Sequence, residues 1–370
     1  MKAIAIIPGT KQANLVERPE PKLTAPDEIK LRVLRVGICG TDREEASGGR
    51  ADAPPGQKDL VIGHEMFGQV VEAGNQVQSV RPGDFGCFTV RRGCGHCPAC
   101  LNDRSDMCST GDYTERGIKQ RDGYETELVV DQLKYFVKVP KEQVPLGVLS
   151  EPTSVAEKAI DEALSVQVAR LPGTGDPQKW LEDKQVLVAG LGPIGLLAAV
   201  ALRLRGAKVL GLDVVDADSL RPRLLAQLGG KYVDGRETKP AALNGAFGQI
   251  DMIFEATGIA HVEFDLLGAL GINGVYVLTG IPGGDRPLQI DGAALMRTLV
   301  LRNQVMIGSV NASRKHFELA VADLGKAYKT WGKTMEQIIT HAVSYTNFAD
   351  VLEKHPDNEI KAVIEWSKPN

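Results

Sequence analysis

Short apolar or alternating runs dominate the first 150 residues of the chain, and Gly, Pro and Asp separate them. Runs with a period of two residues between turn residues are typical of half-buried β-strands. The clearest of these runs are KAIAII, EIKLRVLRVGIC, FGQVVEAG, ETELVVD and KYFVKVP. The pattern therefore predicts a β-rich domain of the barrel or folded-sheet type.

The pattern changes at Glu151, where EPTSVAEKAIDEAL has helical spacing and ARLPGTGDPQKWLEDK follows as a polar, turn-rich connection. Beyond that connection, strand-like runs alternate with helical stretches such as PIGLLAAVALRLRG. The strand-like runs are QVLVAG, AKVLGLD, YVD, IDMIFEATG and GVYVLTG. Alternation of strand and helix predicts a parallel sheet with right-handed crossovers.

The last part of the chain departs from this alternation. Beyond about Asn311, SRKHFELAVADLGKAYKTWG is predicted to form an amphipathic helix and AVIEW a final strand. We expect this tail to return and pack on the first domain. A chain of 370 residues is too long for one ordinary domain, so the prediction is an α/β protein of two domains.

Composition and charge narrow the classes of function. With 43 Lys plus Arg against 47 Asp plus Glu, the formal charge of −4 provides no basic field for nucleic acid or an anionic membrane. No stretch approaches the roughly 20 apolar residues that cross a bilayer. The opening MKAIAIIPGTKQ also lacks the apolar core of a signal peptide. We therefore expect a soluble, cytoplasmic protein without a nucleic-acid or membrane partner.

A glycine motif marks a nucleotide site. VLVAGLGPIGLLAAVAL carries Gly190, Gly192 and Gly195 in GxGxxG order between an apolar strand and an apolar helix, with Pro193 and Ile194 inside the motif. The first glycine permits the tight turn, the second lets the backbone approach a pyrophosphate, and the third allows close packing of helix on strand. The helix N-terminus then faces the phosphate charge. This context predicts dinucleotide binding.

The end of the next strand indicates which dinucleotide is bound. Asp213 follows Gly195 by 18 residues, near the roughly 20 expected for an acidic residue that binds the ribose hydroxyls. Its carboxylate would repel a 2′-phosphate, so NAD is the preferred cofactor. Arg221 and Arg223 lie a few residues on and leave NADP possible.

Four of the six cysteines lie within fifteen residues, in CGHCPACLNDRSDMC. In a reducing compartment such clustering indicates metal ligands more than disulfides. Four thiolates without a histidine or carboxylate at the right spacing close a tetrahedral shell and leave no position for substrate. An iron–sulfur run would place its fourth cysteine three residues after the third. We therefore predict a structural zinc, with His96 an exposed loop residue; its ligands are Cys94, Cys97, Cys100 and Cys108.

A second metal site is suggested by GICGTD and GHE. Cys39 ends a predicted strand, and His64 and Glu65 lie between apolar strands. One thiolate, one imidazole and one or more carboxylates form the mixed shell of a catalytic zinc with an open position. Glu65 and Glu151 are both candidates for the carboxylate, and the spacing does not choose between them. The last cysteine, Cys87, lies in an apolar strand and is predicted to fill the core.

Taken together, the chain resembles the zinc-dependent medium-chain alcohol and polyol dehydrogenases over nearly its full length. The resemblance rests on GICGTD, GHE, VRPGD, the four-cysteine lobe, GLGPIG and FEATG, which occur in that order. It implies a GroES-like catalytic domain, residues 1–155 and 312–370, with the zinc lobe at about 91–110. It also implies an inserted Rossmann domain, residues 156–311. Two zinc ions per chain follow, one catalytic and one structural.

Within that family the chain looks most like the glucose 1-dehydrogenases of archaea and some bacteria, on EPTSVAEKAI, YTERG and IGSVNASRKHF. The resemblance implies that Cys39, His64 and Glu65 or Glu151 surround the catalytic zinc, and that Thr41 touches the reacting hydroxyl and relays its proton. A proton-relay histidine of typical alcohol dehydrogenases is Glu44 here, so the route of the proton stays open. The implied sugar contacts are Thr41, Glu115, Glu151, Glu157 and Asn311, of which Asn311 also lies near the nicotinamide.

The implied reaction is oxidation of the C1 hydroxyl of an aldose to the lactone, with hydride transfer to NAD or NADP. Without the resemblance, Glu157 on the helix SVAEKAIDEAL would be interpreted as half of a solvated charge pair with a lysine. Two alternatives stay open. One is another polyol or amino-alcohol dehydrogenase of the same fold, acting on sorbitol, threonine or an inositol-like ring. The other is a metal-independent nicotinamide-binding protein of the quinone reductase or crystallin type. Relatives in this family are commonly dimers or tetramers, which implies a homo-oligomer.

Overall fold

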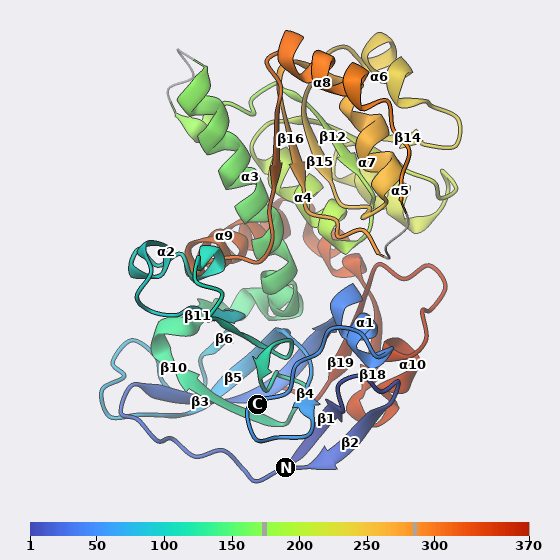
Figure 1. The fold of residues 1–370 in the computed structure, drawn as a ribbon. Coiled ribbons are helices and arrows are strands. Elements are labelled where there is room, and N and C mark those ends of the chain that lie inside the picture. Colours follow the sequence, from blue (N-terminus) through green and yellow to red (C-terminus); the bar gives the residue numbers. More distant parts are fainter. Residues whose placement is uncertain (172–175, 284–286, 370) are drawn as a thin grey trace. The chain divides into compact units, whose positions relative to one another are not determined.

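The computed structural model describes residues 1–171, 176–283 and 287–369 (Figure 1). The chain divides into two compact units. The first, called here the β-rich unit, comprises Met1–Ser154, Asn311–Gly325 and Glu336–Asn370. The second, the parallel-sheet unit, comprises Val155–Val310 and Lys326–Met335. Part of the predicted polar connection, residues 172–175, lies outside the described residues.

The β-rich unit is built around a seven-stranded sheet in which β11, β6, β5, β3, β19 and β18 are neighbours in that order and β10 also pairs with β3. Antiparallel pairing of β19 with β3, Val36 opposite Ile364, confirms that the end of the chain returns to the first domain. The long central strand β3 is buried along most of its length, and its charged residues Arg32 and Arg35 are half-buried between fully buried apolar residues. The strands of this sheet are β3 (Glu28–Ile38), β5 (Glu65–Ala73), β6 (Phe85–Phe88), β10 (Leu128–Gln132), β11 (Phe136–Val139), β18 (Ile339–Ser344) and β19 (Lys361–Glu365).

Two three-stranded sheets and several short helices complete this unit. One sheet consists of β1 (Lys2–Ile6), β2 (Ala13–Glu17) and β4 (Leu60–Val61), and the other of β7 (Arg91–Arg92), β8 (Thr114–Arg116) and β9 (Gln120–Arg121). The short α-helices are α1 (Gly40–Ala46), α2 (Pro98–Leu101) and α10 (Ala349–Leu352). The 3₁₀ turns of the unit include η1 (Ser105–Met107), η2 (Leu133–Tyr135), η3 (Lys141–Leu149) and η6 (Tyr345–Asn347).

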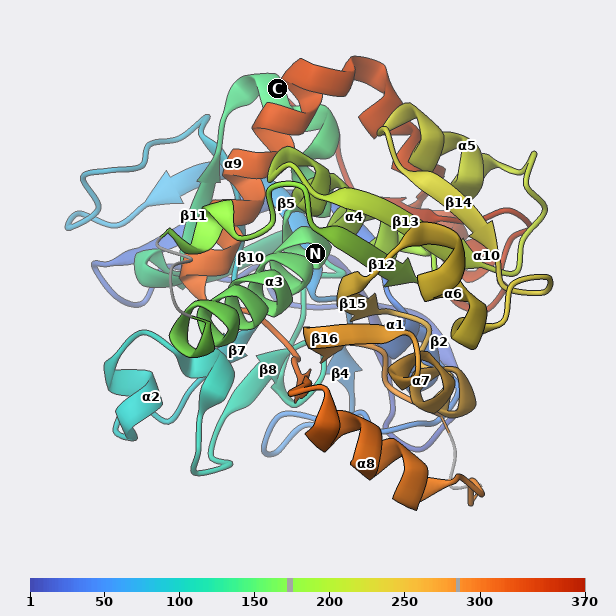
Figure 2. The ribbon, with the colours of Figure 1, turned by 90° about the horizontal axis from the view of Figure 1, so that it is seen from above.

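The parallel-sheet unit confirms the predicted alternation of strand and helix. Its six strands run in the order β14, β13, β12, β15, β16, β17, all parallel, and the order from β14 to β16 can be followed in Figure 2. The strands are β12 (Gln185–Ala189), β13 (Lys208–Asp213), β14 (Lys231–Asp234), β15 (Ile250–Glu255), β16 (Leu270–Leu278) and β17 (Val305–Gly308). The helices between them are α4 (Pro193–Leu204), α5 (Leu220–Gln227), α6 (Pro240–Phe247), α7 (Ala260–Leu267) and α8 (Gly292–Leu301), with the 3₁₀ turn η4 (Pro177–Lys179) before β12.

The strand order reverses at β12, because β13 lies on one side of it and β15 on the other. In open α/β sheets ligands bind outside the carboxyl ends of the strands at such a switch point. The glycine motif begins immediately after β12, so the topology places it at that position. Sequence and topology thus agree on the location of the nucleotide site.

Three elements cross the boundary between the units: α3 (Ser150–Arg170), α9 (Arg314–Trp331) and η5 (Gly332–Ile338). The predicted amphipathic helix after Asn311 is confirmed as α9. Residues 326–335 group with the parallel-sheet unit, whereas the sequence interpretation assigned them to the catalytic domain.

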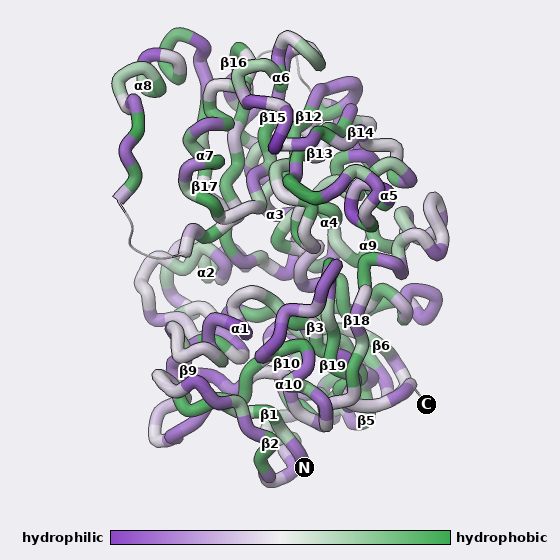
Figure 3. The backbone as a smooth tube through the Cα atoms, turned by 90° about the vertical axis from the view of Figure 1, so that its right-hand side faces the viewer, coloured by the Kyte–Doolittle hydropathy of each residue, from purple (hydrophilic) through white to green (hydrophobic). Residues whose placement is uncertain are grey.

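The cores of both units follow the hydrophobic pattern of the sequence. Figure 3 shows hydrophobic residues along the strands of both sheets, and in the parallel-sheet unit Leu187, Ile253 and Tyr276 are fully buried. Cys87 on β6 is buried as predicted, and burial raises the pKa of its thiol to about 12. Among the described residues, no helix combines the length and apolar character needed to span a bilayer.

Candidate active site

Strand pairing brings the predicted catalytic ligands together. Cys39 follows the last residue of β3, and His64 precedes Glu65, the first residue of β5. In the antiparallel register of β3 and β5, Gly37 lies opposite Glu65. As a result, ligand atoms of Cys39, His64 and Glu65 all lie within 4.8 Å of one another.

Gly37 makes room for this cluster. A Cβ atom placed on Gly37 would lie 2.1 Å from Oε2 of Glu65, far inside any van der Waals contact. The absence of a side chain at this strand position is therefore required by the carboxylate packed against it. This explains the first glycine of GICGTD, a position that the sequence alone did not account for.

Asp42 orients two of the ligands at once, and the sequence interpretation gave it no role. Its Oδ2 accepts a hydrogen bond of 2.8 Å from the backbone N–H of Cys39, which is the N-cap of α1. Its Oδ1 lies 3.3 Å from Nδ1 of the His64 ring. A carboxylate on one ring nitrogen leaves the other nitrogen, Nε2, to bind a metal, and such outer partners fix the ring orientation. The position of Asp42 three residues after Cys39, in the capping box of α1, was the available signal.

Asp42 and His64 each stabilise the charged form of the other. Burial alone would raise the pKa of the Asp42 carboxyl, but the His64 charge outweighs it and the pKa lies below its ordinary value. Burial likewise would lower the pKa of His64, yet the Asp42 carboxylate holds it well above its ordinary value. A metal ion at Nε2 would displace the proton that the ring otherwise carries.

Lys361 on β19 is a second residue that the sequence did not reveal. Its Nζ lies 2.7 Å from Oε1 and 2.5 Å from Oε2 of Glu65, and it donates a 3.0 Å hydrogen bond to the carbonyl of Ile38. Burial would lower the pKa of Lys361, but the Glu65 carboxylate raises it, so the ammonium form persists. The Glu65 carboxylate therefore already has a buried cation as its partner.

Glu151, the alternative carboxylate ligand, lies at the start of α3. Its side chain is buried, and its carboxylate is outside the group of atoms within 4.8 Å. Burial raises the pKa of Glu151 to about 7, the charge of His64 opposes that shift, and the charge of Glu65 adds to it. Glu151 is thus within electrostatic range of the cluster and has less compensating charge than Glu65.

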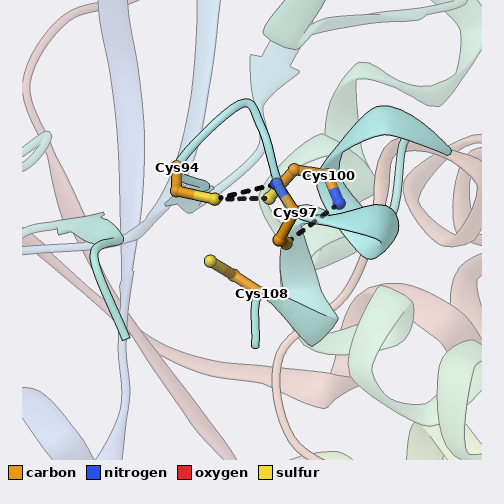
Figure 4. A group of neighbouring side chains, drawn as sticks. All are labelled: Cys94, Cys97, Cys100 and Cys108. Carbon is orange, nitrogen blue, oxygen red and sulfur yellow. Dashed lines mark hydrogen bonds between the residues drawn. The ribbon is translucent and has the colours of Figure 1, made fainter. Parts of the chain in front are cut away.

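The four-cysteine lobe forms a compact sulfur cluster. Figure 4 shows the four thiols pointing toward one another, and their sulfur atoms all lie within 4.8 Å. Backbone N–H groups support the thiolates, since Cys97 donates to Cys94 Sγ at 3.3 Å and Cys100 to Cys97 Sγ at 3.5 Å. His96 is exposed, as predicted, and its Nδ1 lies 3.1 Å from the Cys94 carbonyl, within the same turn.

The thiol pKa values fit a metal-binding cluster. Hydrogen bonding by the Cys100 backbone N–H lowers the pKa of Cys97 to about 5, and the Thr110 hydroxyl lowers that of Cys108 to about 7. Burial, with the neighbouring sulfurs, raises the pKa of Cys100 to about 12. A dication would relieve the crowding of negative charge on the sulfurs. With four sulfur donors the shell is closed, so the residues fit a structural zinc.

The glycine loop has the geometry that a pyrophosphate requires. Gly190 has a φ of 86°, which favours glycine, and Gly192 is the N-cap of α4, with Pro193 and Ile194 opening the helix. A Cβ on Gly195 would lie 1.8 Å from the carbonyl oxygen of Gly190, so only glycine allows α4 to pack against the turn. A Cβ on Gly192 would meet nothing within 4 Å, which leaves room beside the helix N-terminus for the anion.

Asp213 ends β13, next to this loop. Its Oδ2 accepts a 2.8 Å hydrogen bond from the backbone N–H of Leu191, and its Oδ1 accepts one of 2.7 Å from Val214. Nη1 of Arg221 lies 3.6 Å from Oδ2. The carboxylate is thus fixed beside the glycine turn by backbone donors, with an arginine nearby.

The predicted sugar contacts separate into two groups. Glu115 and Asn311 lie together in the β-rich unit, where Asn311 Nδ2 donates a 2.8 Å hydrogen bond to Glu115 Oε1. Glu157 lies in the parallel-sheet unit with Arg205, whose guanidinium approaches its two oxygens at 3.4 and 2.6 Å. The Glu157 side chain is completely buried against Arg205, so it does not form a solvated pair with a lysine, and its contact with sugar stays a prediction. Thr41 lies in the first turn of α1, two residues after Cys39.

Comparison with protein-family models covers most of the chain. Residues 25–141 match the alcohol dehydrogenase GroES-like domain, and residues 144–366 match the glucose dehydrogenase C-terminus. The β-rich unit therefore contains a GroES-like fold, and the parallel-sheet unit has the Rossmann-like sheet that the sequence predicted.

Full-length relatives agree with these matches. The chain is 39% identical over 375 residues to glucose 1-dehydrogenase 1 of Caldivirga maquilingensis, and the alignment covers 100% of both chains. It is 38% identical over 368 residues to glucose 1-dehydrogenase 2 of Vulcanisaeta moutnovskia, and that alignment covers 99% of both chains. Among solved structures, Haloferax mediterranei glucose dehydrogenase in complex with NADP, Zn and gluconolactone has a TM-score of 0.88 at 33% identity, with 100% of both chains covered.

Proposed function

The chain belongs to the glucose 1-dehydrogenase family of zinc-type medium-chain dehydrogenases, and from this we propose that it oxidises the C1 hydroxyl of an aldose to the lactone and passes hydride to NAD or NADP. The observation that carries the proposal is the thiol, imidazole and carboxylate cluster of Cys39, His64 and Glu65. It occurs in a chain that matches glucose 1-dehydrogenases from end to end.

The donor set fits a catalytic zinc. When bound, zinc would supply a Lewis acid that lowers the pKa of the sugar hydroxyl, and the nicotinamide would accept the hydride. Cys39 and a carboxylate offset the charge of the site, so that the product carbonyl can leave. Asp42 holds the His64 ring in the tautomer that presents Nε2.

We assign the third ligand to Glu151. Glu65 already has the buried ammonium of Lys361 as its partner, whereas Glu151 is buried with less compensating charge. A dication would supply that charge. In this assignment Glu65 and Lys361 form the outer support of the site. The test is zinc content: Glu151→Gln should lose the catalytic zinc and Glu65→Gln should retain it, while the reverse pattern would make Glu65 the ligand.

In this proposal the sugar is bound by Thr41, Glu115 and Asn311. The Thr41 hydroxyl, in the first turn of α1 beside Cys39, accepts the proton of the C1 hydroxyl and passes it outward through water or a nearby carboxylate. Carboxylates accept and amides donate, so Glu115 and Asn311 suit neighbouring sugar hydroxyls. Asn311 also retains its proposed contact with the nicotinamide.

NAD is the proposed preferred cofactor. Asp213 is held beside the glycine loop by two backbone donors, where its charge would repel a 2′-phosphate. Arg221, 3.6 Å away, offsets part of that charge and leaves NADP possible. Asp213→Ser should raise KM for NAD and lower KM for NADP. An equal ratio of KM for NAD to KM for NADP in the variant and the wild type would show that Asp213 does not select the cofactor.

The decisive experiment is steady-state reduction of NAD and of NADP with aldoses, polyols, threonine and simple alcohols, using protein shown to contain two zinc ions per chain. Turnover of glucose, galactose or xylose, with no turnover of sorbitol or ethanol, supports the proposal. Turnover of sorbitol or threonine alone would replace it with the polyol or amino-alcohol alternative. Quinone reduction that survives removal of zinc would support the metal-independent alternative.

A homo-oligomer in the cytoplasm is the proposed state of the enzyme. Helix α8 and the edge strand β17 carry exposed apolar side chains, including Val300 at 71%, Leu301 at 75% and Met306 at 43%. Such surface is uncommon on a monomer and is covered in an assembly. Light scattering after size exclusion should therefore give a dimer or tetramer.

A further inference from the structure

Glu115 is held by three donors on a single oxygen. Arg91 lies directly opposite Glu115 in the antiparallel pair of β7 and β8. Its Nε donates to Glu115 Oε1 at 3.0 Å and its Nη2 lies 2.9 Å from the same atom, to which Asn311 Nδ2 also donates at 2.8 Å. Among the described residues, no donor reaches Oε2. The carboxylate is therefore fixed with one oxygen saturated and the other available to a ligand.

The opposite side of the Arg91 guanidinium contacts the four-cysteine lobe. Nη1 donates a 2.6 Å hydrogen bond to the backbone carbonyl of Asp106, in the turn η1. Ser105 Oγ donates back to the Arg91 carbonyl at 3.4 Å. The guanidinium carbon also lies 4.0 Å from the centre of the Tyr113 ring. A planar guanidinium held on several sides has little freedom, so the lobe and Glu115 are rigidly joined through it.

The shape of η1 depends on the cysteines around it. The turn lies between Cys100 and Cys108, whose sulfurs belong to one cluster. The end of β7 packs directly on this region, because a Cβ on Gly93 would lie 2.3 Å from Cys100 Sγ and 3.1 Å from Ser105 Cβ. A metal closing the sulfur cluster therefore fixes the position of the Asp106 carbonyl that Arg91 contacts.

We propose that Arg91 is a positioning residue that transmits the order of the four-cysteine lobe to Glu115, so that the structural zinc sets the affinity for sugar. The proposal rests on the assignment of Glu115 as a sugar contact in the proposed function. It gives the lobe a role in substrate recognition in addition to local stability.

Double-mutant kinetics test the link between Arg91 and Glu115. Arg91→Met should raise KM for glucose roughly tenfold or more, as expected for loss of hydrogen bonds to a charged group, with smaller changes in kcat and in KM for NAD. Arg91→Lys keeps the charge and should restore part of the affinity. In a Glu115→Gln background, Arg91→Met should add less than about twofold, because the residue acts through Glu115.

Arg92→Met is the matched control. Arg92 is the next residue, is equally buried, and binds Asp131 at 2.7 Å instead of Glu115. Arg116 remains on Asp131 at 2.6 Å, so that carboxylate keeps a partner. This variant should lower the thermal midpoint while leaving KM for glucose unchanged. A KM that rises equally in both variants would indicate general loosening of the unit and overturn the proposal.

Zinc release tests the link between Arg91 and the lobe without relying on activity. Release to a chromogenic chelator should show a slow phase from the lobe, and Arg91→Met should speed that phase several-fold while Arg92→Met does not. An unchanged slow phase would overturn the connection to the lobe, and a glucose KM within twofold of wild type would overturn the connection to Glu115. If the wild type oxidises no aldose, the proposed function fails, and zinc release alone then decides whether Arg91 orders the lobe.

Discussion

Asp42→Asn is the sharpest probe of the catalytic site, because the change removes one acceptor and leaves the shape intact. Asp42 is fully buried, with Oδ2 on the Cys39 N–H at 2.8 Å and Oδ1 at 3.3 Å from His64 Nδ1. Asparagine has a single acceptor oxygen. If that oxygen keeps Cys39, the amide NH₂ faces the histidine, which then carries its proton on Nε2 and cannot bind a metal.

If the asparagine oxygen turns toward His64 instead, the Cys39 N–H is left buried and unpaired. An unpaired buried donor costs about 1–3 kcal/mol, which corresponds to roughly a 5- to 150-fold loss in zinc affinity. Either arrangement therefore weakens the catalytic zinc. The loss agrees with the 10- to 100-fold effects that are typical of residues supporting a metal ligand.

The assay is competition for zinc with a chelator of known affinity, followed by steady-state kinetics at saturating zinc. Glu45→Gln is the control, since Glu45 lies three residues further along α1, is equally buried and has no hydrogen-bond partner on either oxygen among the residues that the structure describes. We expect the Asp42 variant to lose affinity and the Glu45 variant to retain it. Zinc affinity of Asp42→Asn within twofold of wild type would refute the assigned role of Asp42.

Burial raises the pKa of Glu45 to about 9, so the protein keeps a proton that the unfolded chain releases above about pH 4.5. The free energy of unfolding should then fall as the pH rises from about 4.5 toward 9. The urea midpoint of Glu45→Gln should therefore exceed that of wild type by more at pH 8 than at pH 5. Urea midpoints of the two proteins that change in parallel with pH would contradict the raised pKa. Gly195→Ala should lower the thermal midpoint and abolish NADH binding, because its Cβ would lie 1.8 Å from the Gly190 oxygen. Gly192→Ala should fold normally and weaken NADH binding alone, and a fluorescence titration separates the two variants. Cys108→Ser should leave one tightly bound zinc per chain and reduce the thermal midpoint, which metal analysis and calorimetry will check; two retained zinc ions would argue against the structural site.

Local patterns in the sequence predicted much of this protein. Short apolar or alternating runs predicted the strands β1, β3, β5, β10 and β11. The alternation of strand and helix predicted the parallel sheet. The glycine motif and the four-cysteine lobe were also recognisable, because all their functional atoms come from one short segment. In such segments the spacing along the chain nearly fixes the distances in space.

The partners of the site residues were not predictable in this way. Lys361 approaches Glu65 across 296 residues, and Asn311 contacts Glu115 across 196. The pairing of Glu157 with Arg205, the bridging position of Arg91 and the contact of Asp42 with His64 likewise emerged only from the folded chain.

The difference has a physical cause. Periodicity records which face of an element is buried, and a motif records atoms joined by a few backbone bonds. Strand register and the packing of distant segments leave neither kind of trace, since they arise from the summed packing of the whole unit. The sequence thus determined which candidate ligands exist and what they can bind, and the tertiary structure decided which charges they meet and which oxygen of Glu115 is occupied by Arg91 and Asn311.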